Sequence, residues 1–100
     1  MDYIKDQVYA TLRLRNKPLT SKDIRELTGF SDTEIRTAIR DLRMDGHKIC
    51  SGSNGFWIWN GIDDTWRHTK AQIKSRIKAL SELYNAMENL PEKGQIEWEI

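Results

Sequence analysis

Two threonines and two arginines in the segment 31–44 have the spacing of one helix face and the chemistry to read base edges. They are Thr33, Arg36, Thr37 and Arg40. The fork of an arginine can bond two acceptors of a guanine at once, and a threonine can bond a base or touch a thymine methyl. We therefore predict that these residues contact DNA bases. In the alternative interpretation, the arginines only decorate a solvated helix and pair with Asp32 or Asp41.

Contacts to DNA phosphates would come from helix N-termini and from a turn between two predicted strands. The candidates are Thr20, Ser21, Lys22, Ser31, Lys48, Ser53 and Asn54. Glycines in the segment 51–55 would let the backbone approach a sugar-phosphate chain. The alternative is that this segment is only a hairpin turn. Its Gly52-x-x-Gly55 spacing also matches an RNA-binding loop, but that loop joins two helices, whereas this one joins strands.

The spacing of apolar residues predicts the helices that would position these side chains. In residues 3–14, Ile4, Val8 and Leu12 recur at intervals of four. This is the pattern of one buried helix face. Pro18 follows in a segment that we interpret as a loop.

A second helix is predicted after a very short extended segment that ends at Thr20. Thr20 and Asp23 have the spacing of a capping box, in which each residue satisfies a backbone N–H of the other. The helix should span roughly residues 21–28, with Ile24 and Leu27 pointing inward.

A third helix should follow after a very short turn. Gly29 stands where a helix end favours a positive φ, and Ser31 with Glu34 forms a second capping box. This helix should continue to about Met44 and end before Gly46. Its buried stripe would be Ile35, Ala38, Ile39 and Leu42. Two short helices joined by so short a turn form a helix-turn-helix arrangement.

Two short strands are predicted next, at residues 47–50 and 56–60, joined by the turn-forming segment 51–55. The order is then helix, short strand, helix, helix, strand, turn, strand. That order is typical of a winged helix-turn-helix. The predicted fold class is mostly α with a small β-hairpin (α+β), followed by a long C-terminal helix.

The segment 42–57, with the sequence LRMDGHKICSGSNGFW, carries a more particular resemblance. Residues 1–60 resemble the winged helix-turn-helix superfamily of DNA-binding domains. The segment itself resembles small helix-turn-helix proteins of bacteriophages and prophages of Gram-positive bacteria. The resemblance implies a phage or mobile-element protein that acts in transcription regulation or DNA replication. It does not imply which of the two.

The second predicted strand has two different faces. Phe56 and Ile58 share one face and should pack on the helices, while Trp57 and Trp59 share the other. Two indoles in water would be unusual, so we expect the following helix to cover them through Trp66 and Ile73. On this interpretation both tryptophans belong to the core.

A long fourth helix is predicted at about residues 65–89, capped by Asp63 or Asp64 and ended by Pro91. Its apolar seam is formed by Trp66, Ile73, Ile77, Leu80, Tyr84 and Met87. The steps of four and three residues from Ile73 onward are typical of a coiled coil. Further apolar residues widen the seam: Ala79, Leu83, Ala86 and Leu90.

The charges of this C-terminal third are strongly segregated. Residues 66–78 contain five lysines and arginines and no acid, whereas residues 79–100 contain five glutamates and one lysine. An antiparallel homodimer would place the basic half of one helix against the acidic half of its mate. A dimer would also suit a protein that reads two half-sites, so we favour it. The alternatives are that the basic residues lie along DNA, or that the helix folds back on its own domain.

The predicted organisation is a winged helix-turn-helix domain at 1–62, a C-terminal helix at 63–90 and a tail at 91–100. Alternating residues at 95–100 could add a strand to the tail. The net charge is only +1, so DNA binding requires basic residues to be concentrated locally. The partners expected are double-stranded DNA and a second copy of the chain. The competing hypothesis is a protein-interaction module that binds a host or phage protein without binding DNA.

The sequence shows no motif of an enzyme, a cofactor site or a metal site. His47 and Cys50 would face opposite sides of a strand, which disfavours a nucleophile–base pair. Cys50 is the only cysteine, so we expect a small buried residue in a reducing compartment. His68 is expected at the surface. We find neither a signal peptide nor an apolar run long enough to span a membrane, and we therefore expect a cytoplasmic, non-enzymatic protein.

Overall fold

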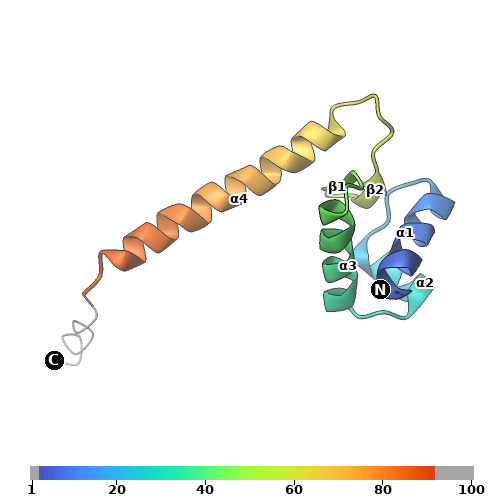
Figure 1. Ribbon diagram of the computed structural model, residues 1–100, viewed down its shortest axis with the longest axis horizontal. Coiled ribbons are helices and arrows are strands. Elements are labelled where there is room, and N and C mark those ends of the chain that lie inside the picture. Colours follow the sequence, from blue (N-terminus) through green and yellow to red (C-terminus); the bar gives the residue numbers. More distant parts are fainter. Residues whose placement is uncertain (1–2, 92–100) are drawn as a thin grey trace. The chain divides into compact units, whose positions relative to one another are not determined.

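Three helices and one hairpin enclose the apolar core of the protein (Figure 1). In the computed structural model, which describes residues 3–91, the elements are α1 (Tyr3–Arg15), α2 (Ser21–Thr28), α3 (Asp32–Met44), β1 (Ile49–Gly52), β2 (Gly55–Ile58) and α4 (Thr65–Glu88). The predicted α+β class is therefore confirmed, with helices in the order of a winged helix-turn-helix and a long helix at the C-terminal side.

The chain divides into two compact units, Met1–Thr69 and Lys70–Ile100. The first unit contains α1 to β2 and also the first turn of α4. This unit therefore extends to Thr69, whereas the predicted winged helix-turn-helix domain ends at residue 62. The predicted tail lies outside the described residues except for Pro91. The possible strand at 95–100 lies outside them entirely.

Both predicted capping boxes are present. The Thr20 hydroxyl accepts from the Asp23 N–H at 3.1 Å, and the Asp23 carboxylate accepts from the Thr20 N–H at 3.0 Å. The corresponding distances between Ser31 and Glu34 are 3.1 and 2.9 Å. Bonds from the backbone N–H and the hydroxyl of Thr20 hold the pKa of Asp23 below its ordinary value. Gly29 ends α2 with a φ of 80°, as predicted. These local bonds fix both ends of α2 and the start of α3.

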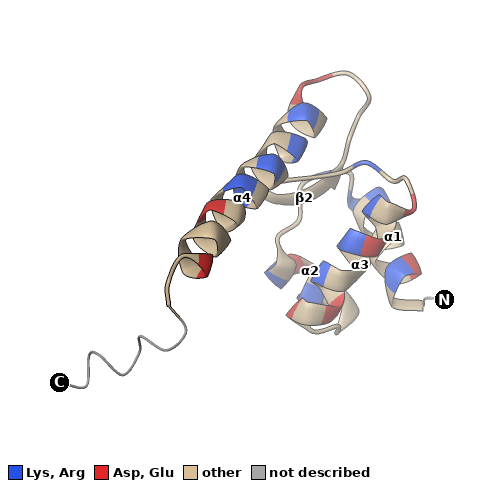
Figure 2. Cartoon of the chain, turned by 60° about the vertical axis from the view of Figure 1, so that its left-hand side comes forward, with Lys and Arg blue, Asp and Glu red and all other residues tan. Residues whose placement is uncertain are grey.

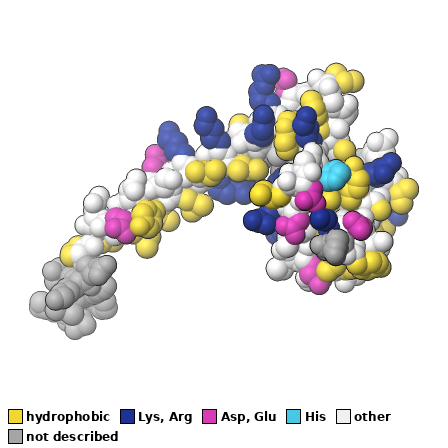
Figure 3. Space-filling model, in the orientation of Figure 1, with side chains coloured by type: hydrophobic (Ala, Val, Ile, Leu, Met, Phe, Trp, Pro, Cys, Tyr) yellow, Lys and Arg dark blue, Asp and Glu magenta, His cyan; other side chains and the backbone are white. Residues whose placement is uncertain are grey.

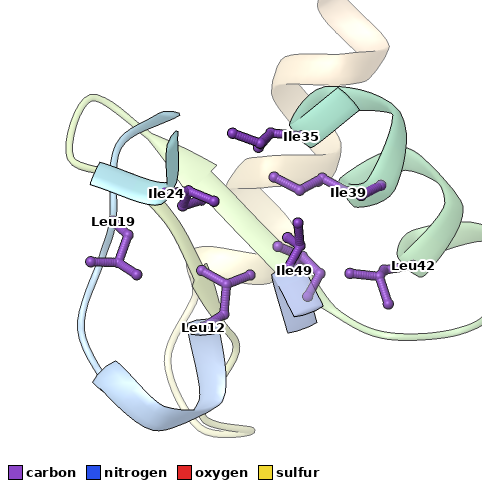
Figure 4. Close-up of a cluster of buried hydrophobic side chains, with 9 residues drawn as sticks. Leu12, Leu19, Ile24, Ile35, Ile39, Leu42 and Ile49 are labelled. Atoms are coloured by element: carbon purple, nitrogen blue, oxygen red, sulfur yellow. The ribbon is translucent and has the colours of Figure 1, made fainter. Parts of the chain in front are cut away.

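The core is formed by one face each of α1, α2 and α3, by Leu19 and by the first strand (Figure 4). Its buried residues are Val8, Leu12, Leu19, Ile24, Ile35, Ala38, Ile39, Leu42 and Ile49. The predicted inward position of Leu27 is wrong, because Leu27 is 45% exposed. Helix α2 is short and reaches the core through Ile24, while the neighbouring Leu19 fills the space beside it.

The hairpin is displaced toward its turn relative to the prediction. Pairing runs from Ile49↔Ile58 to Gly52↔Gly55, so only residues 53–54 lie between the strands. The predicted strands at 47–50 and 56–60 are therefore wrong in their bounds. Ser51 and Gly52 continue the pairing, and Gly55 supplies a positive φ of 114° that ends the tight turn.

The short extended segment before α2 pairs with β2 of the hairpin, as a third strand would. The Leu19 N–H donates to the Phe56 carbonyl at 2.9 Å, and the Phe56 N–H donates to the Leu19 carbonyl at 2.8 Å. This isolated bridge confirms the predicted extended segment. It fixes the start of β2 to the entrance of α2.

The second strand keeps its two faces, but its tryptophans are not core residues. Phe56 and Ile58 pack against the core cluster, whereas Trp57 and Trp59 are half-buried and lie outside it. The predicted core position of the indoles is therefore wrong. The two indoles line an open cavity of about 350 Å³. The Trp59 indole Nε1–H donates to the Asp63 carbonyl at 3.0 Å, so the loop before α4 satisfies this indole.

The first turn of α4 is tied to β1 by threonine side chains. The Asp63 carboxylate accepts from the N–H and the hydroxyl of Thr65, at 3.1 and 2.7 Å, so Asp63 is the capping side chain. Cys50 is fully buried, as predicted, with its Sγ 3.3 Å from the Thr65 hydroxyl. Thr69 is 1% exposed and accepts from the Ser51 N–H at 3.1 Å.

Replacing Thr69 by valine should destabilise this junction. The substitution keeps the shape of the side chain but leaves the Ser51 N–H without its partner, at a cost of about 1–3 kcal/mol in the free energy of unfolding. Urea denaturation followed by circular dichroism measures this change. Thr69→Ser keeps the hydroxyl and is the matched control. Equal stability of the two variants would show that the hydrogen bond contributes nothing.

Candidate nucleic-acid interface

The outward face of α3 carries the four residues predicted to contact bases. Thr33, Arg36, Thr37 and Arg40 are all exposed. The opposite face is buried and consists of Ile35, Ala38, Ile39 and Leu42. The helical period therefore sorts the residues of α3 as predicted, and the four polar side chains are presented together on one rigid element.

Both arginines of this face pair with aspartates of the same helix. The Arg36 Nε lies 2.9 Å from the Asp32 Oδ2, and an Arg40 guanidinium nitrogen lies 3.0 Å from the Asp41 Oδ1. These are the two pairings of the alternative interpretation. The arginine side chains are nevertheless 64% and 70% exposed. Because exposed ion pairs contribute only about 0–1 kcal/mol, either arginine can exchange its aspartate for a base at little cost.

The N-termini of α2 and α3 present polar groups that are already partly used. The Arg36 guanidinium and then the Ser21 hydroxyl hold the pKa of Asp32 below its ordinary value, which places Ser21 beside the start of α3. The hydroxyls of Thr20 and Ser31 accept the capping bonds. The Ser31 hydroxyl still has a proton to donate, so a phosphate contact remains compatible with its cap, whereas the Thr20 hydroxyl also bonds to the Asp23 carboxylate. Lys22 is exposed.

The structure does not bring the predicted contacts of the hairpin together. Ser53 and Asn54 are exposed at the turn, whereas Lys48 precedes β1 at the opposite end of the hairpin. The Lys48 carbonyl accepts from the Trp59 N–H at 2.9 Å, and its ammonium lies 5.0 Å from the centre of the Trp59 ring. Lys48 is thus a neighbour of the tryptophan cavity rather than of the turn.

Two residues of α3 that sequence reasoning left without a role belong to this region. Met44 is 74% exposed and follows Arg40 by four residues, a spacing that could have placed it on the same face. Arg43 donates to the Ile49 carbonyl at 2.9 Å and to the Ser51 hydroxyl at 3.2 Å. It thereby fastens the end of α3 to β1. Only the fold reveals this role, because the spacing of Arg43 does not.

Comparison with family models, with curated proteins and with solved structures gave no match. Within residues 3–91, no group of three or more His, Cys, Asp or Glu side chains is arranged to hold a metal ion. In the same part of the chain, no helix combines the length and the apolar composition needed to cross a bilayer. His68 is exposed, as predicted.

Proposed function

We propose that this protein binds double-stranded DNA sequence-specifically, with α3 as the recognition helix in the major groove. The observation that carries the proposal is the exposed face of α3, where two forked arginines and two threonines lie together. In a helix-turn-helix, the second helix of the pair presents such residues to base edges. The capping boxes and the Arg43 bonds to β1 hold this helix in one orientation.

Phosphate contacts would come from the polar ends of α2 and α3 and from the turn of the hairpin. Helix N-termini offer unpaired N–H groups and a favourable dipole to an anion. The exposed turn at residues 53–54 would reach a second part of the backbone. The net charge is only +1, because 15 acidic residues nearly balance 16 basic ones. Non-specific electrostatic binding to DNA should therefore be weak.

The resemblance of residues 42–57 to phage and prophage proteins extends the proposal to a biological setting. We propose a cytoplasmic phage or prophage protein that acts without enzymatic activity in transcription regulation or DNA replication. It would bind its site as a homodimer through the C-terminal helix, because two recognition helices can then read two half-sites.

The test is selection of a preferred duplex from a random-sequence pool, followed by fluorescence anisotropy at two salt concentrations. We expect a selected motif, palindromic for a dimer, that binds about a thousandfold or more tightly than random duplex. Affinity should fall as the salt concentration rises, since phosphate contacts release counterions. Absence of binding above background at the lower salt concentration would contradict the proposal.

The competing function is a protein-interaction module. The observation in its favour is that Asp32 and Asp41 already pair with the two arginines of α3, while the apolar face of α4 is exposed. Such a module would capture a host or phage protein equally well after both arginines are removed. DNA selection on the same preparation would then return no motif.

A further inference from the structure

The C-terminal unit exposes an apolar face that has no cover of its own. Between residues 77 and 90 of the described chain, the large apolar side chains are 55–65% exposed: Ile77, Leu80, Leu83, Tyr84, Met87 and Leu90. Figure 3 shows hydrophobic side chains running along α4. An apolar stripe on one helix face is the signature of a helix that packs against a partner.

The shape of this face indicates that the partner is another helix. A shallow hollow on α4 is lined by Ile77, Leu80, Ser81, Tyr84 and Asn85. The first four of these residues stand at positions i, i+3, i+4 and i+7. Four residues at this spacing form the hole that accepts one side chain of a facing helix in a coiled coil. Helix α4 therefore carries a coiled-coil hole at the middle of its apolar face.

The residues flanking the seam fix the expected direction of the partner. The seam residues are Ile73, Ile77, Leu80, Tyr84 and Met87. Along one side of the seam run Lys74, Ser81 and Glu88, at intervals of seven. Along the other side run Arg76 and Leu83, and Leu90 follows at the same interval just beyond the end of α4. Charge is thus basic at the start of each edge, and Glu88 makes one edge acidic at its end. Figure 2 shows the same order along α4 as a whole, with basic residues first and acidic residues after them.

We propose that the apolar face of α4 binds α4 of a second copy in an antiparallel coiled coil of defined register. In this register Leu80 packs against Tyr84 of the second copy, and Ile77 packs against Met87 of the second copy. Lys74 then faces Glu88 of the second copy, and symmetry repeats this ion pair at the other end. Tyr84 of the second copy enters the hole between Ile77 and Leu80.

The parallel arrangement of the same two helices lacks this complementarity. In a parallel coiled coil, each residue of one edge faces the other edge of the partner, five residues further along the chain. Arg76 would face Ser81 of the second copy, and Leu83 would face Glu88 of the second copy. No pair of opposite charges forms along either edge. The antiparallel register is the one that forms an ion pair beside the seam, between Lys74 and Glu88 of the second copy, while Arg76 lies toward Leu90 of the second copy.

This inference deepens the dimeric DNA binding proposed above and rests on it for its use, but its test needs no DNA. Sedimentation equilibrium of the full chain should show a monomer–dimer equilibrium. Lys74→Glu and Glu88→Lys should each weaken dimerisation roughly tenfold, because each replaces two symmetric ion pairs by repulsion. Combining them should restore the wild-type constant. A wild-type chain that stays monomeric, or a double variant weaker than both single ones, overturns the proposal.

Cysteine pairing tests the register itself. Leu80→Cys and Tyr84→Cys chains are mixed under mild oxidation, while the native Cys50 remains buried. The antiparallel register predicts more disulfides between a Leu80→Cys chain and a Tyr84→Cys chain than between two identical chains. Preferential linkage of Leu80→Cys chains to one another would indicate parallel helices and overturn the proposal. A dimer with these properties but no DNA motif would refute the proposed function alone.

Discussion

Replacing Arg36 and Arg40 together by alanine should abolish sequence-specific DNA binding and leave the fold intact. Each bidentate contact between an arginine and a guanine contributes about 1–3 kcal/mol of discrimination, so the pair should cost roughly a hundredfold or more in specific affinity. The fold should survive, because both side chains are more than half exposed and the ion pairs that they form within residues 3–91 are with surface aspartates. Fluorescence anisotropy on the selected duplex measures the loss.

The matched control for this double variant is Arg15→Ala, which removes a positive charge from the exposed end of α1. Loss of a charge alone should weaken binding to all duplexes equally, whereas loss of a base contact should relax the preference at particular positions. Thermal melting by circular dichroism verifies that each variant is folded. Retention of the full sequence preference by the double variant would rule out α3 as the reading helix.

A second large effect is expected from Gly55→Ala, in stability rather than in binding. A Cβ on Gly55 would lie 2.3 Å from the Leu19 carbonyl oxygen and 2.6 Å from the Thr20 N, both backbone atoms. The φ of 114° adds conformational strain for any residue with a Cβ. To relieve the overlap, the backbones of Gly55 and of Leu19–Thr20 must move apart, which should weaken the bridge between Leu19 and Phe56. We expect a loss of about 2–4 kcal/mol in the free energy of unfolding.

The control for this variant is Gly61→Ala, where φ is also positive, at 85°, but the added Cβ has no neighbour within 4 Å among the described residues apart from those adjacent in the chain. This substitution should lower the free energy of unfolding only by the conformational strain, about 1 kcal/mol. Chemical denaturation of both variants separates strain from overlap. If Gly55→Ala proved no more destabilising than Gly61→Ala, the close approach of Leu19 to the hairpin would be refuted.

The parts of the fold that the sequence predicted correctly are those fixed by neighbours in the chain. The capping boxes at Thr20 and Ser31 need only a residue three positions away, so the bounds of α2 and the start of α3 follow from local chemistry. The stripe of α3 follows equally from its period. Leu27 has the same period but remains exposed, because burial depends on what packs against a helix and not on the helix alone.

The parts that could not be predicted depend on contacts between distant residues. Thr69 bonds to Ser51 across 18 positions, and nothing in the local sequence distinguishes it from any other threonine of a helix. The hairpin register, set by Gly55 against Leu19, separates Lys48 from the turn at residues 53–54. For the candidate site, the sequence therefore predicted the outward face of α3. It could not predict that Lys48 lies apart from Ser53 and Asn54.

Arg43 links the end of α3 rigidly to the hairpin. Its guanidinium holds the Ile49 carbonyl and the Ser51 hydroxyl, so the end of α3 and the strand that leads to the exposed turn keep a fixed separation. On the proposed mode of binding, the protein would meet DNA with a preset span between the base-reading face and the backbone-contacting turn. Duplexes whose grooves already have the width to match that span would bind without deformation. Other duplexes would bind more weakly, because bending or twisting them costs free energy. The shape of a duplex would then influence its affinity even at base pairs that no side chain touches.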